Sequence, residues 1–323
     1  MLAQKIKAGI VLSEFRKAYG EEYQMSISSI MLRIAFKHSD DKRDKGLTTP
    51  ENILRFDNIR YGQDPKWNIL DVYRPKSVDG PLPVIVSVHG GGWVYGDKDR
   101  YQYYCMSLAQ QGFAVVNFSY RLAPRHKFPA SLEDTNSVFH WVLYNTDKYG
   151  FDPSRIFAVG DSAGAHNLAL YSCICTNPDF AKEFPFSAPD GFAPTAIALN
   201  CGVYRIDVSN KDLTTRLMAD YLPEKGSAEE IRKISVINHL TSAFPPSFIM
   251  TSEGDFLAPA ALPMVNALKE LNVPVEYHYY GNPDNVLGHV FHCNIRLPDA
   301  QQCNRDECEW FKSFGNSSEG LSE

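Results

Sequence analysis

The chain has 323 residues, of which 44 % are hydrophobic and 22 % are charged, and its formal net charge is −6. This balance is typical of a globular protein with a sizeable core. It argues against a nucleic-acid partner, because no basic run supplies the positive surface that such partners need. No stretch approaches the roughly 20 apolar residues of a membrane span, and the apolar run in MLAQKIKAGIVLSEF is too short for a secretory signal.

The cysteine count bears on the compartment. There are seven cysteines, an odd number for a disulfide framework. In a chain of this length they indicate reduced thiols, and we therefore expect a cytoplasmic protein.

The residue pattern of the first half of the chain changes at residue 53, from helix-like to strand-like. Residues 1–46 are predicted to be helical, and their charged end, KHSDDKRDKG, is predicted to be a solvated connector. The alternating stretches ILRFDNIRY (53–61) and WNILDVYRP (67–75) predict a strand pair. The runs LPVIVSVHG (82–90) and FAVVNFSYR (113–121) are nearly unbroken and apolar, as strands buried on both faces of a parallel sheet are.

Strands and helices alternate through the rest of the chain. We expect helices at 100–112, 129–150, 162–176, 258–272 and 299–314, and strands at 155–160, 195–202, 247–255 and 275–280. This alternation predicts an α/β fold with a mostly parallel sheet. The stretch at 275–280 is expected at the sheet edge, where it offers a surface for pairing in a homodimer.

Two segments do not fit the alternation. Residues 203–243 are polar and helix-prone, and they separate two strands, so they are predicted to form a cap over the carboxyl ends of the sheet, where ligands bind. The predicted domains are a helical cap or lid at 1–50 and a catalytic domain at 51–323 that contains this insertion.

The stretch IFAVGDSAGAH (156–166) places Ser162 between two glycines, where a strand is expected to become a helix. A serine hydroxyl is a useful nucleophile only when it is exposed, held still and next to a base. A sharp strand–helix turn provides this exposure, and Gly160 and Gly164 remove the Cβ atoms that would clash in it. The alternative is a glycine-rich helix start in which Ser162 is only a cap.

A second glycine motif favours the catalytic interpretation. VHGGGWVYG (88–96) follows an apolar strand, and consecutive glycines let backbone N–H groups approach a developing oxyanion. A dinucleotide-binding loop is the rival, but the G-x-G-x-x-G pattern is absent. His89 is interpreted as a loop anchor rather than a base.

Five motifs in this order resemble the α/β-hydrolase superfamily, specifically its hormone-sensitive-lipase-like esterases. The resemblance covers roughly residues 53–315 and rests on HGGGW (89–93), YRLAP with FPA (120–130), GDSAG (160–164), GDFL (254–257) and GHVF (288–291). It implies an α/β-hydrolase fold, a triad of Ser162, Asp255 and His289, and an oxyanion hole formed by Gly91, Gly92 and Ala163. The sequence departs from the family pattern at Ala165, in DFLAPA and in HVF, which affects pocket shape and substrate choice more than the chemistry.

The acid and the base can also be argued locally. Asp255 follows an apolar strand and would hold the imidazole tautomer of the base. Glu253 is the competing acid, and the alternative role for Asp255 is the N-cap of the next helix. His289 lies in a loop after the last strand, and His292 is the competing base. A zinc site that combines HVFHC with Cys303 and Cys308 is a further alternative, but its spacing fits no standard pattern.

These features predict a serine carboxylesterase for short- to medium-chain acyl esters that needs no cofactor and no metal. Trp93 is expected near the mouth of the substrate pocket. An amide hydrolase, such as a formamidase or a small peptidase, is an alternative with the same triad. A non-catalytic binding protein on the same fold is a third hypothesis, which the presence of all three triad residues disfavours.

Overall fold

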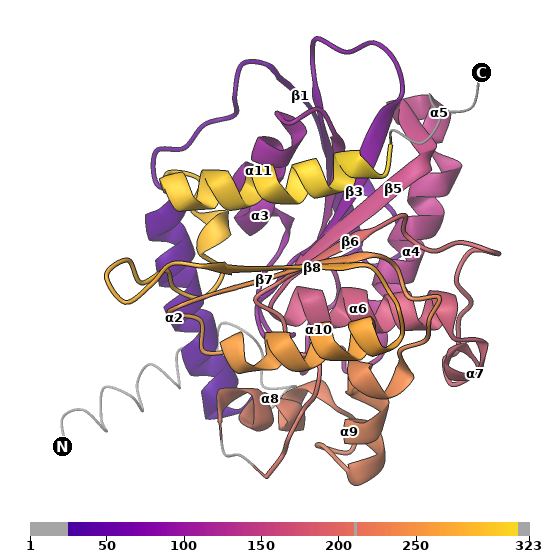
Figure 1. The fold of residues 1–323 in the computed structure, drawn as a ribbon, viewed down its shortest axis with the longest axis vertical. Helices are drawn as coiled ribbons and strands as arrows, with labels where there is room; N and C mark the ends of the chain where they lie inside the picture. The colour runs from indigo at the N-terminus through magenta and orange to yellow at the C-terminus, as the bar shows by residue number, and fades with distance from the viewer. Residues whose placement is uncertain (1–24, 210–211, 316–323) are drawn as a thin grey trace.

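A computed structural model describes residues 25–209 and 212–315 of the chain. The predicted helical segment before residue 25 lies outside the described residues. Within them, strands and helices alternate as the sequence predicts, and the expected α/β fold is confirmed (Figure 1).

One eight-stranded sheet forms the centre of the fold. Its order is β1-β2-β4-β3-β5-β6-β7-β8. The predicted pair β1 and β2 is antiparallel, β2 is also antiparallel to β4, and the remaining neighbours are parallel. The stretch VEYHYY is β8, which lies at the sheet edge as predicted. The strands are β1 (Ile53–Arg60), β2 (Ile69–Pro75), β3 (Leu82–Val88), β4 (Ala114–Phe118), β5 (Phe151–Asp161), β6 (Ile197–Asn200), β7 (Ser247–Ser252) and β8 (Val275–Tyr280).

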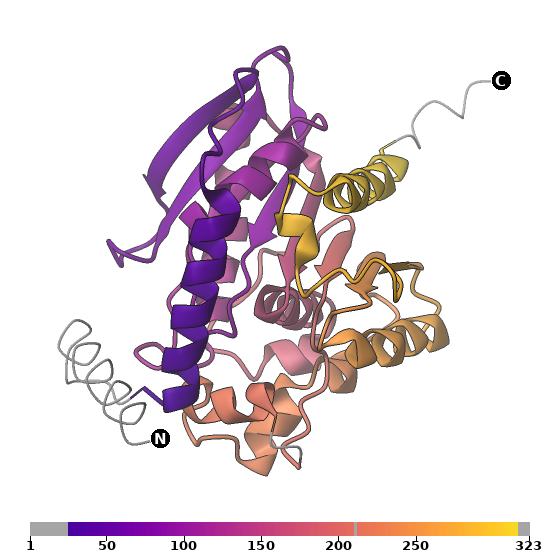
Figure 2. The same cartoon turned by 90° about the vertical axis from the view of Figure 1, so that its left-hand side faces the viewer.

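Helices cover both faces of the sheet. Helices α3 and α11 pack on one face, and α4, α6 and α10 pack on the other (Figures 1 and 2). The α-helices are α2 (Ile27–Asp44), α3 (Lys98–Ala109), α4 (Ala130–Tyr144), α5 (Thr146–Tyr149), α6 (Ala163–Thr176), α7 (Pro178–Ala181), α8 (Leu213–Tyr221), α9 (Ala228–Ile234), α10 (Ala261–Glu270) and α11 (Pro298–Ser313). Three short 3-10 helices are η1 (Val236–His239), η2 (Ala258–Ala260) and η3 (Phe291–Cys293).

The central strands are buried on both sides, which explains their unbroken apolar character. In β3, Val84, Val86 and Val88 pack with the helices of one face, while Ile85 packs with α3 and α11 on the other. Successive side chains of a strand point to opposite faces, so in a strand covered on both faces nearly every side chain is buried.

The charged segment 37–46 corrects one prediction. It is not a connector, because α2 continues to Asp44 through most of it. Arg43 forms ion pairs with Asp40 and Asp44, and these side chains are only 13–17 % exposed. His38 therefore lies within α2. Most of residues 37–46 are nevertheless exposed, as predicted for a solvated segment, and Asp40, Arg43 and Asp44 are the partly buried exceptions.

Helix α2 runs along the molecule and packs against α8 and α3 (Figure 2). Its N-terminus is fixed by Asp220 of α8, which accepts hydrogen bonds from the Ser26 N–H at 3.0 Å and the Ser29 hydroxyl at 2.5 Å. The predicted insertion between two strands is present: α8, α9 and η1 all lie between β6 and β7. None of the described helices is both long and apolar enough to cross a membrane.

Candidate active site

Ser162 stands at a sharp turn between β5 and α6, in the strand-then-helix context that the sequence predicts. Its φ of 54° and ψ of −119° are rare for a residue with a side chain. Such strain persists only where the surrounding structure fixes it, and it clusters at functional sites. The Ser162 N–H donates to the Asn200 carbonyl at 2.9 Å, and the Ser162 carbonyl accepts from the His166 N–H at 3.2 Å.

The two flanking glycines are required by contact distances. A Cβ added at Gly160 would lie 2.6 Å from the carbonyl oxygen of Gly164. A Cβ added at Gly164 would overlap the carbonyl oxygen of Val88 in β3 and lie 2.6 Å from that of His89. The turn therefore packs directly against the end of β3. The prediction that the two glycines avoid Cβ clashes is confirmed.

The glycine-rich loop after β3 faces the same turn. Gly91 and Gly92 adopt φ values of 118° and 60°, and an added Cβ at Gly91 would overlap the Tyr95 carbonyl. The Gly91 carbonyl accepts from the N–H groups of Val94 and Tyr95. Ala163 is the first residue of α6, where backbone N–H groups have no partner within the helix. Gly91, Gly92 and Ala163 all line the cavity beside Ser162.

His89 anchors this loop, as expected. It is fully buried, its ring stacks on Tyr120 at 4.0 Å, and its Nδ1 lies 2.8 Å from the Gly90 carbonyl. Burial lowers the pKa of His89 to about 4, so the ring is neutral at physiological pH.

Asp255 and His289 form a short hydrogen bond, 2.6 Å between Oδ1 and Nδ1. Burial alone would raise the pKa of Asp255, but the bond with His289, the Leu257 N–H and the Thr251 hydroxyl together hold it below its ordinary value. The His289 Nε2 is buried and has no hydrogen-bond partner among the described residues. It lines the same cavity as Ser162. Ser162 and His289 thus line one cavity, and Asp255 is hydrogen-bonded to His289.

The two competing residues lie elsewhere. The Glu253 carboxylate is exposed and accepts a hydrogen bond from Tyr279 of β8 at 2.7 Å. His292 is fully buried with its ring edge against Tyr104, and burial lowers its pKa to about 3. The alternative role of Asp255 as a helix cap is not seen, because Leu257 occupies the cap position of η2 and no side chain caps it.

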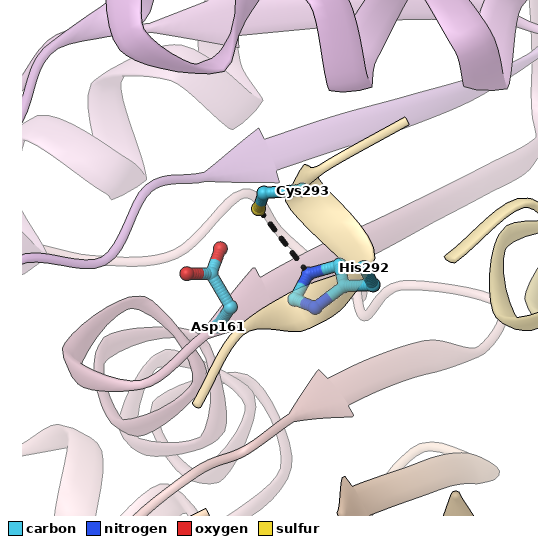
Figure 3. A group of neighbouring side chains, drawn as sticks. All are labelled: Asp161, His292 and Cys293. Atoms are coloured by element: carbon cyan, nitrogen blue, oxygen red, sulfur yellow. Dashed lines mark hydrogen bonds between the residues drawn. The ribbon is translucent and has the colours of Figure 1, made fainter. Parts of the chain in front are cut away.

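The residue before Ser162, Asp161, meets two other buried polar side chains, His292 and Cys293 (Figure 3). Asp161, His292 and Cys293 place one polar atom each within 4.8 Å of one another, and Cys293 Sγ lies 3.6 Å from His292 Nε2. Cys303 and Cys308 lie in α11, outside this group, so the zinc arrangement considered from the spacing does not form. Tyr101 donates to Asp161 at 2.6 Å and accepts from the Gly90 N–H at 3.0 Å.

The Tyr101 bridge links the serine turn to the glycine loop. Burial raises the pKa of Asp161 to about 7, against the opposing hydrogen bond from Tyr101. Together these contacts fix the relative positions of the nucleophile candidate and the backbone N–H groups that face it, which is the preorganisation that oxyanion stabilisation requires.

The cavity beside Ser162 has two arms that share Phe36, Ser162 and Phe256. The apolar arm has a volume of about 20 Å³ and is lined by Leu32, Gly92, Trp93, Ala163, Val203 and Leu217 among others. The polar arm has a volume of about 140 Å³ and is lined by Ser39, Asp40, Arg43, Tyr95, Asp161 and His289 among others.

Trp93 lies deeper than expected. It is only 3 % exposed, and its ring stacks on Tyr221 at 4.8 Å while its Nε1 donates to His166 at 3.3 Å. It therefore belongs to the wall of the apolar arm rather than to a mouth.

Sequence reasoning missed the α2 residues of the polar arm. Phe36, Asp40 and Arg43 recur at the spacing of one helix face, and Leu32 precedes them by one turn. That periodicity was the available signal, but the density of charge in the segment obscured it.

Comparisons with known proteins identify the family of this chain. The family described as BD-FAE matches residues 70–264. The Versiconal hemiacetal acetate esterase of Dothistroma septosporum is 30 % identical over 71 % of this chain and 73 % of its own length. Esterase LipC of Mycobacterium tuberculosis is 31 % identical over 62 % of this chain, which spans 51 % of that relative.

Among solved structures, Esterase B from Lactobacillus rhamnosis superposes with a TM-score of 0.79 at 22 % identity, covering 90 % of this chain and 97 % of that one. This structural likeness supports the fold, and the sequence matches extend it to the family. The chain therefore belongs to the α/β-hydrolase superfamily, within the hormone-sensitive-lipase-like carboxylesterases that its motifs indicate.

Proposed function

We propose that this protein is a serine carboxylesterase that acts through Ser162, His289 and Asp255. The observation that carries the proposal is the 2.6 Å bond between His289 Nδ1 and Asp255, which leaves Nε2 free in the cavity that Ser162 lines. This bond fixes the imidazole tautomer in which Nε2 is the proton acceptor.

In the proposed mechanism, His289 Nε2 takes the proton of Ser162 as the hydroxyl attacks the ester carbonyl. The carbonyl oxygen becomes an oxyanion, and the N–H groups of Gly91, Gly92 and Ala163 stabilise it. His289 then gives its proton to the leaving alcohol, and an acyl-enzyme remains on Ser162. Water, activated by His289, releases the acid and restores the serine. No step in this scheme calls for a cofactor or a metal.

We infer that the acyl group is short to medium in length. The apolar arm itself has a volume of about 20 Å³, and it shares Val203, Phe256 and Leu257 with a neighbouring cavity of about 270 Å³. Leu32 of α2 and Leu213 and Leu217 of α8 line this arm. Their position supports the proposal that the segments 1–50 and 203–243 form the cap of the site, over the hydrolase domain of residues 51–323.

Compartment and assembly remain part of the same proposal. All seven cysteines are free thiols, which favours a reducing compartment such as the cytoplasm. The edge position of β8 favours pairing in a homodimer.

The test compares wild-type protein with Ser162→Ala on p-nitrophenyl acetate and on a matched anilide. Loss of the nucleophile should lower kcat for the ester by about 10⁴–10⁶-fold, with the circular dichroism spectrum unchanged. A folded variant that keeps a tenth of the activity would refute the assignment of Ser162. Faster turnover of the anilide than of the ester would favour the amide hydrolase instead.

A further inference from the structure

The two arms of the cavity divide the substrate at its scissile bond. His289 lines only the polar arm, whereas Gly92 and Ala163 line only the apolar arm. In the proposed reaction, His289 must reach the oxygen of the leaving alcohol to protonate it. The alcohol half of the ester therefore lies in the polar arm, and the acyl half lies in the apolar arm.

The polar arm is a built surface on one face of α2. Asp40 accepts hydrogen bonds from Tyr95 at 2.8 Å and pairs with Arg43 at 3.0 Å. Arg43 is held on its other side by Asp44, at 2.7 Å and 2.9 Å, and by the Arg100 carbonyl. These contacts fix the arm before any ligand arrives, which lowers the entropic cost of binding.

The carboxyl end of α2 is fixed as well. Arg296, in the loop that leads to α11, donates to the carbonyls of Arg43 and Lys45. The polar wall is thus attached to the body of the enzyme rather than to a free helix end.

The chemistry of this wall selects among alcohols. It carries the carboxylate of Asp40, the guanidinium of Arg43 and the hydroxyls of Ser39 and Tyr95. A free hydroxyl on the alcohol can donate to Asp40 and accept from Ser39. An anionic group would face the carboxylate of Asp40, and the guanidinium of Arg43 cannot offset this because it is already paired with Asp40 and Asp44.

We propose that the substrate is a short-chain ester of a neutral polyhydroxy alcohol, and that Asp40 and Ser39 of α2 bind the free hydroxyls of that alcohol. This inference rests on the proposed function. It makes α2 the element that selects the alcohol, while the apolar arm selects the acyl group.

The test measures kcat/KM for three acetate esters of similar size: glycerol monoacetate, n-butyl acetate and acetylcholine. Wild-type protein should prefer glycerol monoacetate over butyl acetate by about tenfold, as one or two charge-assisted hydrogen bonds provide. Asp40→Asn should reduce that ratio several-fold. Asp41→Asn is the matched control, since Asp41 follows directly on the same helix but pairs with Lys37 and Arg100 at the surface.

Three results would overturn the proposal: a wild-type preference for butyl acetate, a preference for acetylcholine, or an equal ratio in the Asp40→Asn and Asp41→Asn variants. Failure of the proposed function is distinguishable, because a protein without esterase activity would turn over none of these esters and would also leave p-nitrophenyl acetate intact.

Discussion

At the residue scale, the pair Asp255 and His289 carries the acid–base chemistry. Asp255→Asn should lower kcat by about 10⁴-fold, because an amide at this position favours the wrong imidazole tautomer. Glu253→Gln removes a carboxylate only two residues away, but that side chain points to Tyr279 and away from the cavity, so it should cost far less. Steady-state kinetics on p-nitrophenyl acetate measure both.

The matched comparison for the base is His289→Ala against His292→Ala. His289→Ala should cause a severe loss of kcat. His292→Ala should affect activity only through packing, because His292 is buried against Tyr104. A reversed order in either pair would transfer the role to the competing residue.

At the element scale, α2 and α8 close the apolar arm. Leu217 of α8 and Leu32 of α2 are the nearest side-chain neighbours of a Cβ built at Gly92, at 2.8 Å and 3.2 Å. Leu217→Ala should enlarge the arm and raise the ratio of kcat/KM for octanoate over acetate esters by about tenfold, with a loss of about 2–5 kcal/mol in the free energy of unfolding.

The control for this change is Leu268→Ala in α10, an equally buried leucine that does not line the cavity. It should lose similar stability without changing the acyl-length ratio. If the two variants had equal octanoate-to-acetate ratios of kcat/KM, α8 would not be part of the acyl-binding site.

Elements differed in how well the sequence predicted them. The turn at Ser162 and the glycine loop were predicted because their requirements are local: glycines where carbonyls approach, and a serine between a strand and a helix. The end of α2 was not, because Asp40 and Arg43 are held by contacts with distant residues, the Tyr95 hydroxyl and the Arg100 carbonyl. The two arms of the cavity are lined by α2, the glycine loop and residues near 256, which are far apart in the chain. The sequence therefore could not predict the shape or volume of either arm.

At the scale of the whole molecule, Glu307 links three elements. This fully buried side chain of α11 accepts from Tyr104 of α3 at 2.9 Å and from Asn200 of β6 at 2.6 Å. Burial raises its pKa from 4.5 to about 7, against these two hydrogen bonds. The folded protein therefore holds a proton here that the unfolded chain releases above pH 4.5.

Binding of this proton stabilises the folded protein fully below pH 4.5, the pKa of Glu307 in the unfolded chain. This contribution to the free energy of unfolding is lost as the pH rises through about 7, the pKa in the folded protein. The loss for one such group amounts to roughly 3 kcal/mol. In Glu307→Gln the site is neutral at every pH, so the variant should lose less stability than wild type between pH 5 and pH 8. Denaturant unfolding at both pH values measures the difference, and parallel losses in the two proteins would contradict it.

The central claim is that Ser162 carries the acyl group during turnover. The most direct measurement is labelling of the whole protein with a fluorophosphonate, followed by mass spectrometry of the digested chain. We predict a single label on Ser162, slowed by His289→Ala and absent in Ser162→Ala. A label on another residue, or hydrolysis of esters by a protein whose Ser162 stays unlabelled, would contradict the account.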